Sequence, residues 1–205
     1  MAALPAVILA GGRAMRMGGG DKVLLPLNGK PLLQHVLDRL RPQAQPIAIS
    51  ANGDAARFSA FGLPVLPDSL PNFPGPLAGI LAAMDWASAI GAEAVVTAAG
   101  DTPFPPGDLV QRLREAGGSG LSLAADYDPN RRLRLHPVFG LWPVSLRSDL
   151  RQTLIAGQGR IRDFADRHDA VMAIFDGQQN AFLNVNTPDD LVHAATVGPM
   201  RKEYG

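Results

Sequence analysis

Short apolar runs alternate with helical stripes along the first half of this 205-residue chain. Continuous apolar runs of this length are typical of strands that are buried on both faces. Such strands are expected at residues 6–10, 46–50, 64–67 and 94–99. Helices are expected between and after them, at residues 31–40, 54–61, 77–90 and 108–115. This order predicts a parallel sheet with helices on both faces.

The second half of the chain has a less regular pattern. Strands are expected at residues 121–125, 135–142 and 171–175, and helices at residues 145–156, 159–167 and 188–195. A polar loop at 126–134 separates the first two of these strands. No repeat or linker interrupts the pattern, and a chain of this length can bury one sizeable core. We therefore expect a single α/β domain over residues 1–205.

Composition excludes several classes of function. The chain is 46% hydrophobic and 19% charged, which is typical of a globular protein, and its formal net charge is zero. A neutral balance argues against general nucleic-acid binding. The absence of cysteine excludes disulfides, thiolate zinc sites and cysteine nucleophiles. No membrane span and no signal peptide are recognised, so a cytoplasmic protein is expected.

A glycine-rich loop follows the first strand, with the sequence LAGGRAMRMGGGDK at 9–22. The phosphate loop of ATPases requires G-x-x-x-x-G-K-[ST], but here the Gly-Lys pair at 29–30 precedes proline. The dinucleotide fingerprint requires G-x-G-x-x-G, and no glycine lies two positions after Gly11 or Gly12. Both common glycine loops are therefore excluded.

The remaining interpretation of this loop is a different phosphate cradle. Adjacent glycines allow backbone N–H groups to approach a ligand closely. Arg13, Arg16 and Lys22 add donors that suit a polyphosphate. The alternative is a solvated turn without a ligand. The position of the loop at the carboxyl end of the first strand favours a ligand site, because open α/β sheets bind ligands there.

The pattern L-A-G-G-x-x-x-R-M-G-G-x-D-K resembles the signature of Rossmann-like nucleotidyltransferases, and most closely that of the bacterial molybdenum cofactor guanylyltransferases. Three further segments match this family in order: GPLAG at 75–79, GDTPF at 100–104 and NVNTPDDL at 184–191. The resemblance implies a three-layer α/β sandwich with a mostly parallel central sheet. It also implies a nucleotide-binding half over about 1–105 and an acceptor-binding half over about 106–195.

The activity implied by this resemblance is transfer of GMP from GTP to the phosphate of molybdopterin or Mo-molybdopterin, with release of pyrophosphate. Mg²⁺ is the implied cofactor, and transient contacts with molybdenum insertion proteins and molybdoenzyme chaperones are implied as well. The cytidylyl relatives usually have Leu-Ala-Ala-Gly where this chain has Leu-Ala-Gly-Gly, so the implied base is guanine. The alternatives are a cytidylyl or other small-metabolite nucleotidyltransferase, and a non-catalytic module that binds nucleotide or delivers cofactor.

The resemblance also assigns a GTP site. Its residues are Leu9, Ala10, Gly11, Gly12, Lys22, Ser50, Asn52, Asp68 and Asp101. Asp68 is assigned to the base because guanine presents two donors, N1–H and the 2-amino group, to a carboxylate; the alternative is a turn or helix cap. Ser50 stands where the family commonly has asparagine, which leaves Asn52 as the stronger candidate.

Asp101 follows the apolar strand at 94–99, where a carboxylate can hold Mg²⁺ together with substrate phosphates. The alternative is a turn-forming aspartate. The family usually has cysteine in place of Gly100, a difference that should leave the carboxylate role intact. Lys22 and Arg16 are expected to neutralise the triphosphate, and these two residues with Asp101 form the expected catalytic set.

The acceptor is assigned to His136, Asn184 and Asn186. The family has a matching His-Pro pair, and the arginine-rich stretch at 131–137 suits a phosphorylated pterin. Asn184 and Asn186 are two residues apart, so their side chains are expected on one side of a strand. The alternatives are an ordinary strand histidine and a helix start at Thr187, a possible N-cap.

Overall fold

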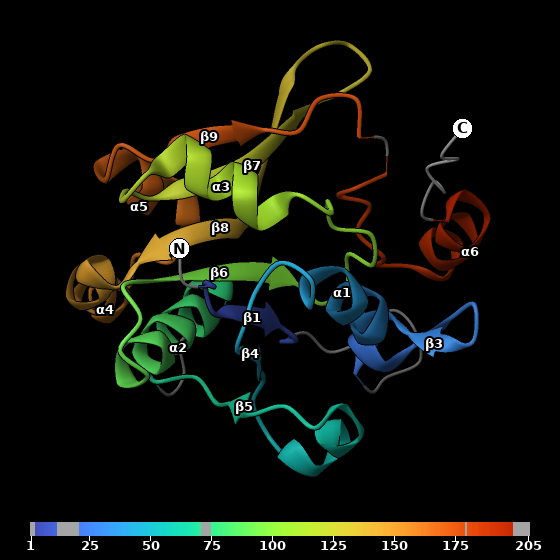
Figure 1. Cartoon of the computed structure of the whole chain (residues 1–205), viewed down its shortest axis with the longest axis horizontal. Helices are drawn as coiled ribbons and strands as arrows, with labels where there is room; N and C mark the ends of the chain where they lie inside the picture. The colour runs from blue at the N-terminus through green and yellow to red at the C-terminus, as the bar shows by residue number, and fades with distance from the viewer. Residues whose placement is uncertain (1–2, 12–20, 71–74, 179, 199–205) are drawn as a thin grey trace.

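The computed structural model describes residues 3–11, 21–70, 75–178 and 180–198. Within these residues a central sheet has the strand order β5-β4-β1-β6-β8-β7-β9 (Figure 1). Its strands are β1 (Ala6–Leu9), β4 (Ile47–Ser50), β5 (Val65–Leu66), β6 (Ala94–Ala99), β7 (Ser122–Tyr127), β8 (Leu133–Pro143) and β9 (Val171–Ile174). Each of the seven strands expected from the apolar runs is present.

The sheet consists of a parallel half and a mixed half. In the first half, β5, β4, β1 and β6 are parallel, and Ile8 of β1 lies opposite Ile49 and Ala98. In the second half, β8 is antiparallel to both β6 and β7, whereas β9 is parallel to β7. Parallel pairs therefore predominate among the described strands, and the predicted mostly parallel sheet is confirmed.

Helices cover both faces of the sheet. The helices are α1 (Leu32–Leu40), α2 (Pro76–Ala89), α3 (Leu109–Gly117), α4 (Arg147–Ile155), α5 (Ile161–Arg167) and α6 (Pro188–Val197). Short 3-10 helices occur at η2 (Lys22–Leu24), η3 (Ala55–Phe61) and η4 (Val144–Leu146). The helix expected at 54–61 is thus a 3-10 helix, which starts where the Asp54 carboxylate accepts the N–H of Ala56 at 2.9 Å.

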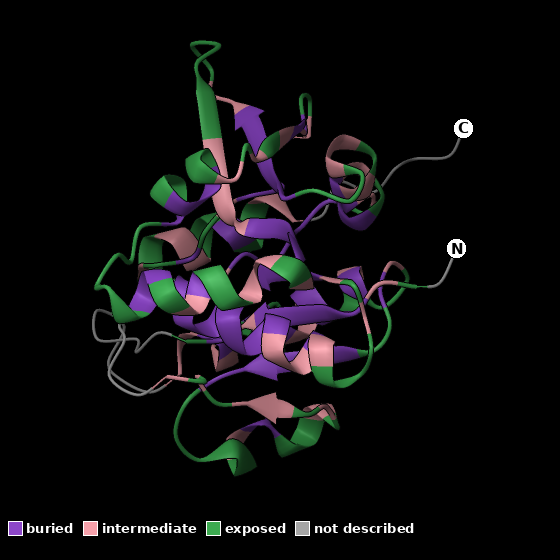
Figure 2. Cartoon of the chain, turned by 90° about the vertical axis from the view of Figure 1, so that its left-hand side faces the viewer, coloured by how far each residue is buried: buried purple, intermediate pink, exposed green. Residues whose placement is uncertain are grey.

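Neighbouring residues of β1 pack into two separate cores. Ile8 belongs to the core under α1 and α3, whereas Val7 belongs to the core under α2, α4 and α5. Both side chains are fully buried, which explains why the strand is a continuous apolar run rather than an alternating one. Figure 2 shows buried residues concentrated in the sheet and the inner faces of its helices. The three-layer sandwich is confirmed.

Two local features differ from the expected pattern. A two-stranded ribbon, β2 (Pro26–Leu27) and β3 (Lys30–Pro31), turns at Asn28 and Gly29, both with positive φ. Its Asn-Gly turn is a recognised hairpin signal that the expected elements did not include. In β8 the register against β7 shifts between Leu123 and Ala124, next to Pro137, which has no N–H to donate to the ladder.

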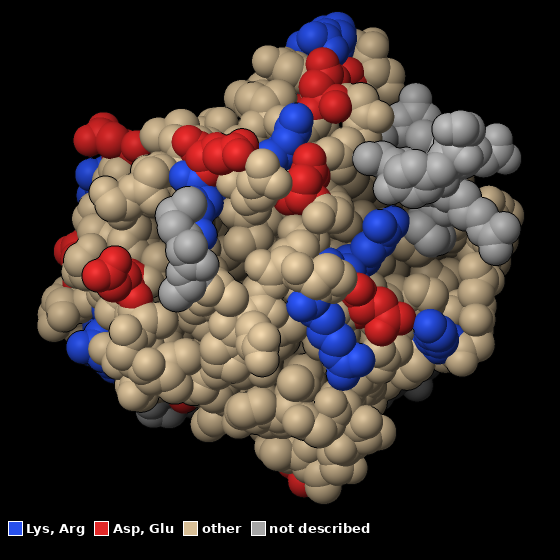
Figure 3. All heavy atoms as spheres, in the orientation of Figure 1, with Lys and Arg blue, Asp and Glu red and all other residues tan. Residues whose placement is uncertain are grey.

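Acidic and basic side chains are interspersed on the face shown in Figure 3, with no continuous basic stripe. Among the helices of the described residues, none is long and apolar enough to cross a bilayer.

Candidate functional site

A cavity of about 470 Å³ opens at the carboxyl ends of the parallel strands. Loops that follow β1, β4, β5 and β6 meet there, as expected for an open α/β sheet. Seven of the residues assigned from the sequence line it: Leu9, Gly11, Ser50, Asn52, Asp68, Asp101 and Asn184. The parallel register brings the first six together, and Asn184 joins them from the segment that follows β9, so the seven come from five separate segments.

The floor of the cavity continues the pairing of β1 with β4. The N–H of Ala10 donates to the Ser50 carbonyl at 2.8 Å, so the chain remains in register until it reaches Gly11. Ala10 and Ser50 are 2% and 3% exposed, and Ser50 lines the cavity. This geometry places the start of the glycine-rich loop directly beside the loop that follows β4.

Asn52 and Asp68 form a reciprocal pair at one end of the cavity. The Asn52 amide donates to Asp68 Oδ2 at 2.6 Å, and its Oδ1 accepts the backbone N–H of Asp68 at 2.9 Å. These bonds orient the Asp68 carboxylate and leave Oδ1 without a hydrogen bond to Asn52. The arrangement suits an acceptor for paired donors such as those of guanine.

Arg57 supports this end of the cavity and was not identified from the sequence. Its guanidinium donates to the carbonyl of Asn52 at 2.6 Å and forms an ion pair with Asp21, the residue before Lys22. It therefore links the loop that follows β4 to the segment that carries Lys22. No motif marks Arg57, because its partners are brought close only by the fold.

Lys22 joins three distant segments beside Asp101, which lines the cavity, although Lys22 and Asn186 are not among the lining residues. Its ammonium forms an ion pair with Asp101 Oδ2 and donates to Asn186 Oδ1 at 2.6 Å. The side chains of Lys22 and Asp101 are only 14% and 20% exposed. A lysine, a carboxylate and an amide thus converge where the resemblance places the triphosphate and the acceptor.

A helix cap fixes Asn186. The Asp190 carboxylate accepts the backbone N–H groups of Asn186 and Thr187, each at 2.9 Å, and these bonds lower the pKa of Asp190. The Thr187 hydroxyl accepts the N–H of Asp190 at 3.1 Å in return, which confirms Thr187 as the N-cap of α6. A capping box therefore holds the amide that binds Lys22.

Asn184 and Asn186 flank a residue that is anchored to the site. Val185 is fully buried, and its N–H donates to the carbonyl of Asp101 at 2.9 Å. The expected strand is not formed in this segment, because it makes only this isolated bond beside the end of β6. The expected alternation still holds: both asparagines are exposed and Val185 points inward.

The acidic side chains of the site limit which metal ions it can hold. Among the described residues, no group of three or more histidine, cysteine, aspartate or glutamate side chains could hold one. Asp101 offers a single carboxylate, with Oδ2 directed at Lys22 and Oδ1 3.4 Å from the Thr102 hydroxyl. One carboxylate fits Mg²⁺, which keeps several waters and binds substrate phosphates, and does not fit a metal that requires a full protein cage.

His136 is not among the residues that line the cavity. Its ring stacks on Phe182 with centroids 4.0 Å apart, and Nε2 lies 2.9 Å from Asp126 Oδ1. Burial lowers the pKa of His136, and the Asp126 carboxylate offsets only part of this effect. These contacts match the alternative of an ordinary strand histidine. The assignment of His136 to the acceptor stays a prediction.

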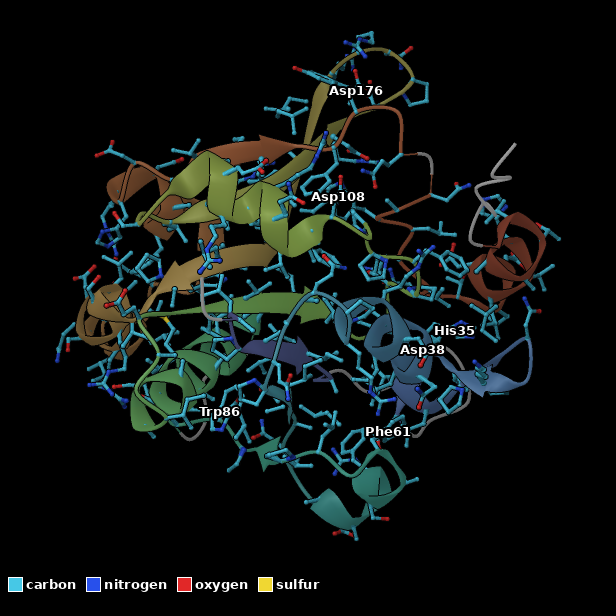
Figure 4. All side chains as sticks on the ribbon, viewed as in Figure 1. His35, Asp38, Phe61, Trp86, Asp108 and Asp176 are labelled. Carbon is cyan, nitrogen blue, oxygen red and sulfur yellow. The ribbon has the colours of Figure 1, made fainter. Side chains whose placement is uncertain are left out.

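The arginine-rich stretch borders a second cavity of about 480 Å³ beside the β7–β8 hairpin. Arg134 binds Asp126 with two hydrogen bonds, at 2.9 and 2.6 Å, and Arg131 binds Asp176 at 2.8 Å. Figure 4 shows Asp176 at this outer end of the molecule. Both arginines are therefore engaged by carboxylates of the chain itself.

Three residues assigned or considered from the glycine-rich loop, Gly12, Arg13 and Arg16, lie outside the described residues.

Gly79 belongs to the GPLAG segment and was not identified from the sequence as a site residue, yet it lines the cavity. A Cβ at this position would lie 3.0 Å from Ser50 Oγ and 3.9 Å from Asp68 Oδ1. The absence of a side chain at Gly79 keeps this end of the cavity open.

The chain is similar to known proteins over nearly its full length. The MobA-like NTP transferase domain matches residues 6–171. A molybdenum cofactor guanylyltransferase of Cereibacter sphaeroides is 50% identical over 197 residues, covering 96% of this chain and 97% of the relative. Another, of Mesorhizobium japonicum, is 50% identical over 196 residues and covers 92% of this chain and 93% of the relative.

Solved structures share the fold at lower sequence identity. Molybdopterin-guanine dinucleotide biosynthesis protein A from Archaeoglobus fulgidus has a TM-score of 0.73 at 23% identity, covering 95% of this chain and 98% of the other. A nucleotidyl transferase from Methanothermobacter thermautotroptrophicus has a TM-score of 0.73 at 21% identity, covering 95% and 97%. By sequence and by fold, the chain belongs to the MobA-like NTP transferases and, within them, to the molybdenum cofactor guanylyltransferase family.

Proposed function

We propose that this protein transfers GMP from GTP to the phosphate of molybdopterin or Mo-molybdopterin and releases pyrophosphate. The observation that carries the proposal is the contact of Lys22 and Asn186 with each other and of Lys22 with Asp101, which lines the same cavity as the Asn52–Asp68 pair. The similarity to named guanylyltransferases at 50% identity supports the same substrates.

The Asp68 end of the cavity is the proposed guanine site. Asp68 Oδ1 would accept hydrogen bonds from N1–H and the 2-amino group, while Asn52 holds Oδ2 at 2.6 Å. Cytosine presents an acceptor ring nitrogen in this region rather than two donors, so a fixed carboxylate would discriminate against it. The triphosphate would then extend past Gly11 toward Lys22.

The Lys22 end is the proposed site of chemistry. The acceptor's terminal phosphate attacks the α-phosphorus of GTP in line; a new P–O bond forms, and the bond to the β-phosphate oxygen breaks. A phosphate monoester has a second pKa of about 6, so the nucleophile is already ionised and needs no strong general base. Catalysis then depends on positioning and charge neutralisation.

Each residue at this end has a defined part in that step. Lys22 neutralises the triphosphate and the departing pyrophosphate. Asp101 is the residue that would hold Mg²⁺, which when bound supplies positive charge to the reacting phosphates. Asn184 and Asn186 lie in the segment that follows β9 and would contact the acceptor, so the nucleotide-binding half is assigned to about 1–105 and the acceptor-binding half to about 106–195.

Purified protein tests the proposal when pyrophosphate release is measured with molybdopterin, Mg²⁺ and each of GTP, CTP, ATP and UTP. The expected result is release with GTP and little with the other nucleotides. Release with CTP in preference to GTP would overturn the guanylyl assignment. Binding of GTP without any release would instead support a non-catalytic module.

A further inference from the structure

Gly100 occupies a position where the structure has no room for a side chain. It follows β6 and precedes Asp101, and its N–H donates to the carbonyl of Leu9 at 2.9 Å. A Cβ at this position would lie 2.9 Å from Val23 Cγ1 and 3.1 Å from the Leu9 carbonyl oxygen. The first of these distances is shorter than non-bonded carbon contacts allow, so a neighbour would have to move.

The nearest neighbour, Val23, belongs to the segment that carries Lys22. Val23 is only 3% exposed and is the buried residue of the single turn η2. That turn is closed by the N–H of Leu24 on the carbonyl of Asp21 at 3.0 Å and by the N–H of Leu25 on that of Lys22 at 3.1 Å. Because a valine side chain is stiff at χ1, the space that Val23 occupies sets the position of the whole turn.

Two adjacent contacts therefore join the same two segments. Val23 packs where a side chain of residue 100 would be, and Lys22, the residue before Val23, forms its ion pair with Asp101, the residue after Gly100. We infer that Val23 and Gly100 are positioning residues: the Val23 side chain packs against the Gly100 backbone, and this packing holds Lys22 next to Asp101. This inference rests on the proposed roles of Lys22 and Asp101.

This chain has Gly100 where the family usually has cysteine. In this chain a cysteine Cβ would meet Val23 at the distance given above, so Gly100 and the valine side chain are complementary. Any β-carbon at residue 100 is expected to displace η2 and separate Lys22 from Asp101. The backbone φ of Gly100 lies outside the positive range, so space rather than strain limits substitution there.

A double-mutant cycle tests the inference with Gly100→Ala, Val23→Ala and the double variant. Displacing a catalytic group by up to 1 Å can reduce the rate about 100-fold, so Gly100→Ala is expected to reduce kcat about 10- to 100-fold with a smaller effect on the KM for GTP. In the Val23→Ala background the same substitution is expected to cost less than about threefold, because contacting residues couple in such cycles.

A readout independent of activity accompanies the kinetics. Acylation of Lys22 by an N-hydroxysuccinimide ester, measured by mass spectrometry relative to the exposed Lys30, reports whether Lys22 is held in its ion pair. We expect faster labelling of Lys22 in Gly100→Ala and a return toward the wild-type rate in the double variant. Gly159→Ala is the matched control, because a Cβ there meets nothing within 4 Å.

Equal effects of Gly100→Ala in both backgrounds, on kcat and on labelling, would overturn the inference and assign the effect to the Leu9 carbonyl contact. If Gly100→Ala does not fold, Val23→Ala still tests the inference, since loss of the valine methyls should increase Lys22 labelling, and unchanged labelling would contradict it. A wild-type protein that releases no pyrophosphate would refute the proposed function alone, while the labelling comparison would still test the positioning of Lys22.

Discussion

The two halves of the sheet use different means to place polar side chains. In the parallel half, β5, β4, β1 and β6 deliver their following loops to one edge, and the residues there line one cavity. In the mixed half, β8 runs against β6 and β7, and its polar residues pair with one another across the hairpin, as Arg134 does with Asp126. The parallel strands bring polar groups from separate segments together at one edge, whereas the polar groups of this hairpin pair within the hairpin itself.

Lys22 connects the two halves. It is anchored by Asp101 from the parallel half and by Asn186 from the segment that follows the mixed half. The comparison therefore predicts that substitutions at this junction have the largest effect on activity. Substitutions at the Asp68 end of the cavity, the proposed guanine site, should affect nucleotide binding. Substitutions in the β7–β8 hairpin should mainly affect stability.

Lys22→Ala is expected to have the largest effect. Removing one preorganised charge that stabilises a transition state typically costs about 100- to 1000-fold in kcat, and we expect a loss in this range. Lys30→Ala is the control, because Lys30 is 59% exposed and pairs only with Asp38 among the ion pairs found. Steady-state pyrophosphate release measures both. A Lys22→Ala variant within a few-fold of wild type would remove Lys22 from the mechanism.

Asp68→Asn is expected to have the next largest effect, and to act on nucleotide binding. Loss of charged hydrogen bonds to the base should raise the KM for GTP about 10- to 100-fold with a smaller change in kcat. Asp54→Asn serves as control, because asparagine can also cap η3. Kinetics with GTP and CTP would show a reduced preference for GTP. An unchanged preference would place guanine recognition elsewhere.

Gly79→Ala is expected to separate an effect on nucleotide binding from an effect on stability. The added Cβ would lie 3.0 Å from Ser50 Oγ and 3.3 Å from Leu9 Cδ2, so the cavity would become narrower at its Asp68 end. We expect GTP binding to weaken by about tenfold, close to the effect of one buried methylene in a specificity pocket. The melting temperature should remain near that of wild type, since alanine is the better helix former by about 1 kcal/mol. Calorimetric titration and thermal melts measure the two effects.

The smallest expected effect concerns the mixed half and depends on pH. Burial lowers the pKa of His136 from its ordinary value of 6.5, so the unfolded chain binds this proton more readily than the folded one. The resulting stability is fully present above pH 6.5 and is lost as the pH falls through the folded pKa. Asp126, whose pKa is held low by Arg134 and His136 despite burial, adds a similar loss below pH 3.8.

Urea unfolding at pH 7.5 and pH 5.5 tests this pH dependence. His136→Gln should shrink the decrease in unfolding free energy between the two pH values, while His193→Gln, an exposed position on α6, should leave it unchanged. The activity of His136→Gln should stay close to that of wild type if His136 is structural. A large increase in the KM for molybdopterin would instead support the acceptor assignment.

The sequence predicted the parallel half closely because local chemistry determines it. Continuous apolar runs mark strands that are buried on both faces, and the strand expected at 94–99 is β6 to the residue. The bounds of the hairpin were predicted less accurately. β8 extends two residues before and one residue after its expected range, because pairing with β7 brings polar residues such as Arg134 into the strand.

Site residues that belong to motifs were predictable, whereas their supports were not. Asp68, Asp101 and Asn184 were assigned in advance and all line the cavity. Arg57 was not, because its role depends on contacts with Asn52 and Asp21 that only the fold creates. The direct contact of Lys22 with Asn186 likewise joins residues 164 positions apart, which no local pattern encodes.

One measurement tests most directly the division between a nucleotide end and an acceptor end. GTP affinity by calorimetry and the KM for molybdopterin are determined for Asp68→Asn and for Asn184→Ala. The predicted result is a crossover: Asp68→Asn weakens GTP and leaves the KM for molybdopterin nearly unchanged, whereas Asn184→Ala raises that KM and leaves GTP affinity nearly unchanged. Equal loss of GTP affinity in both variants, without an effect on molybdopterin, would contradict the division.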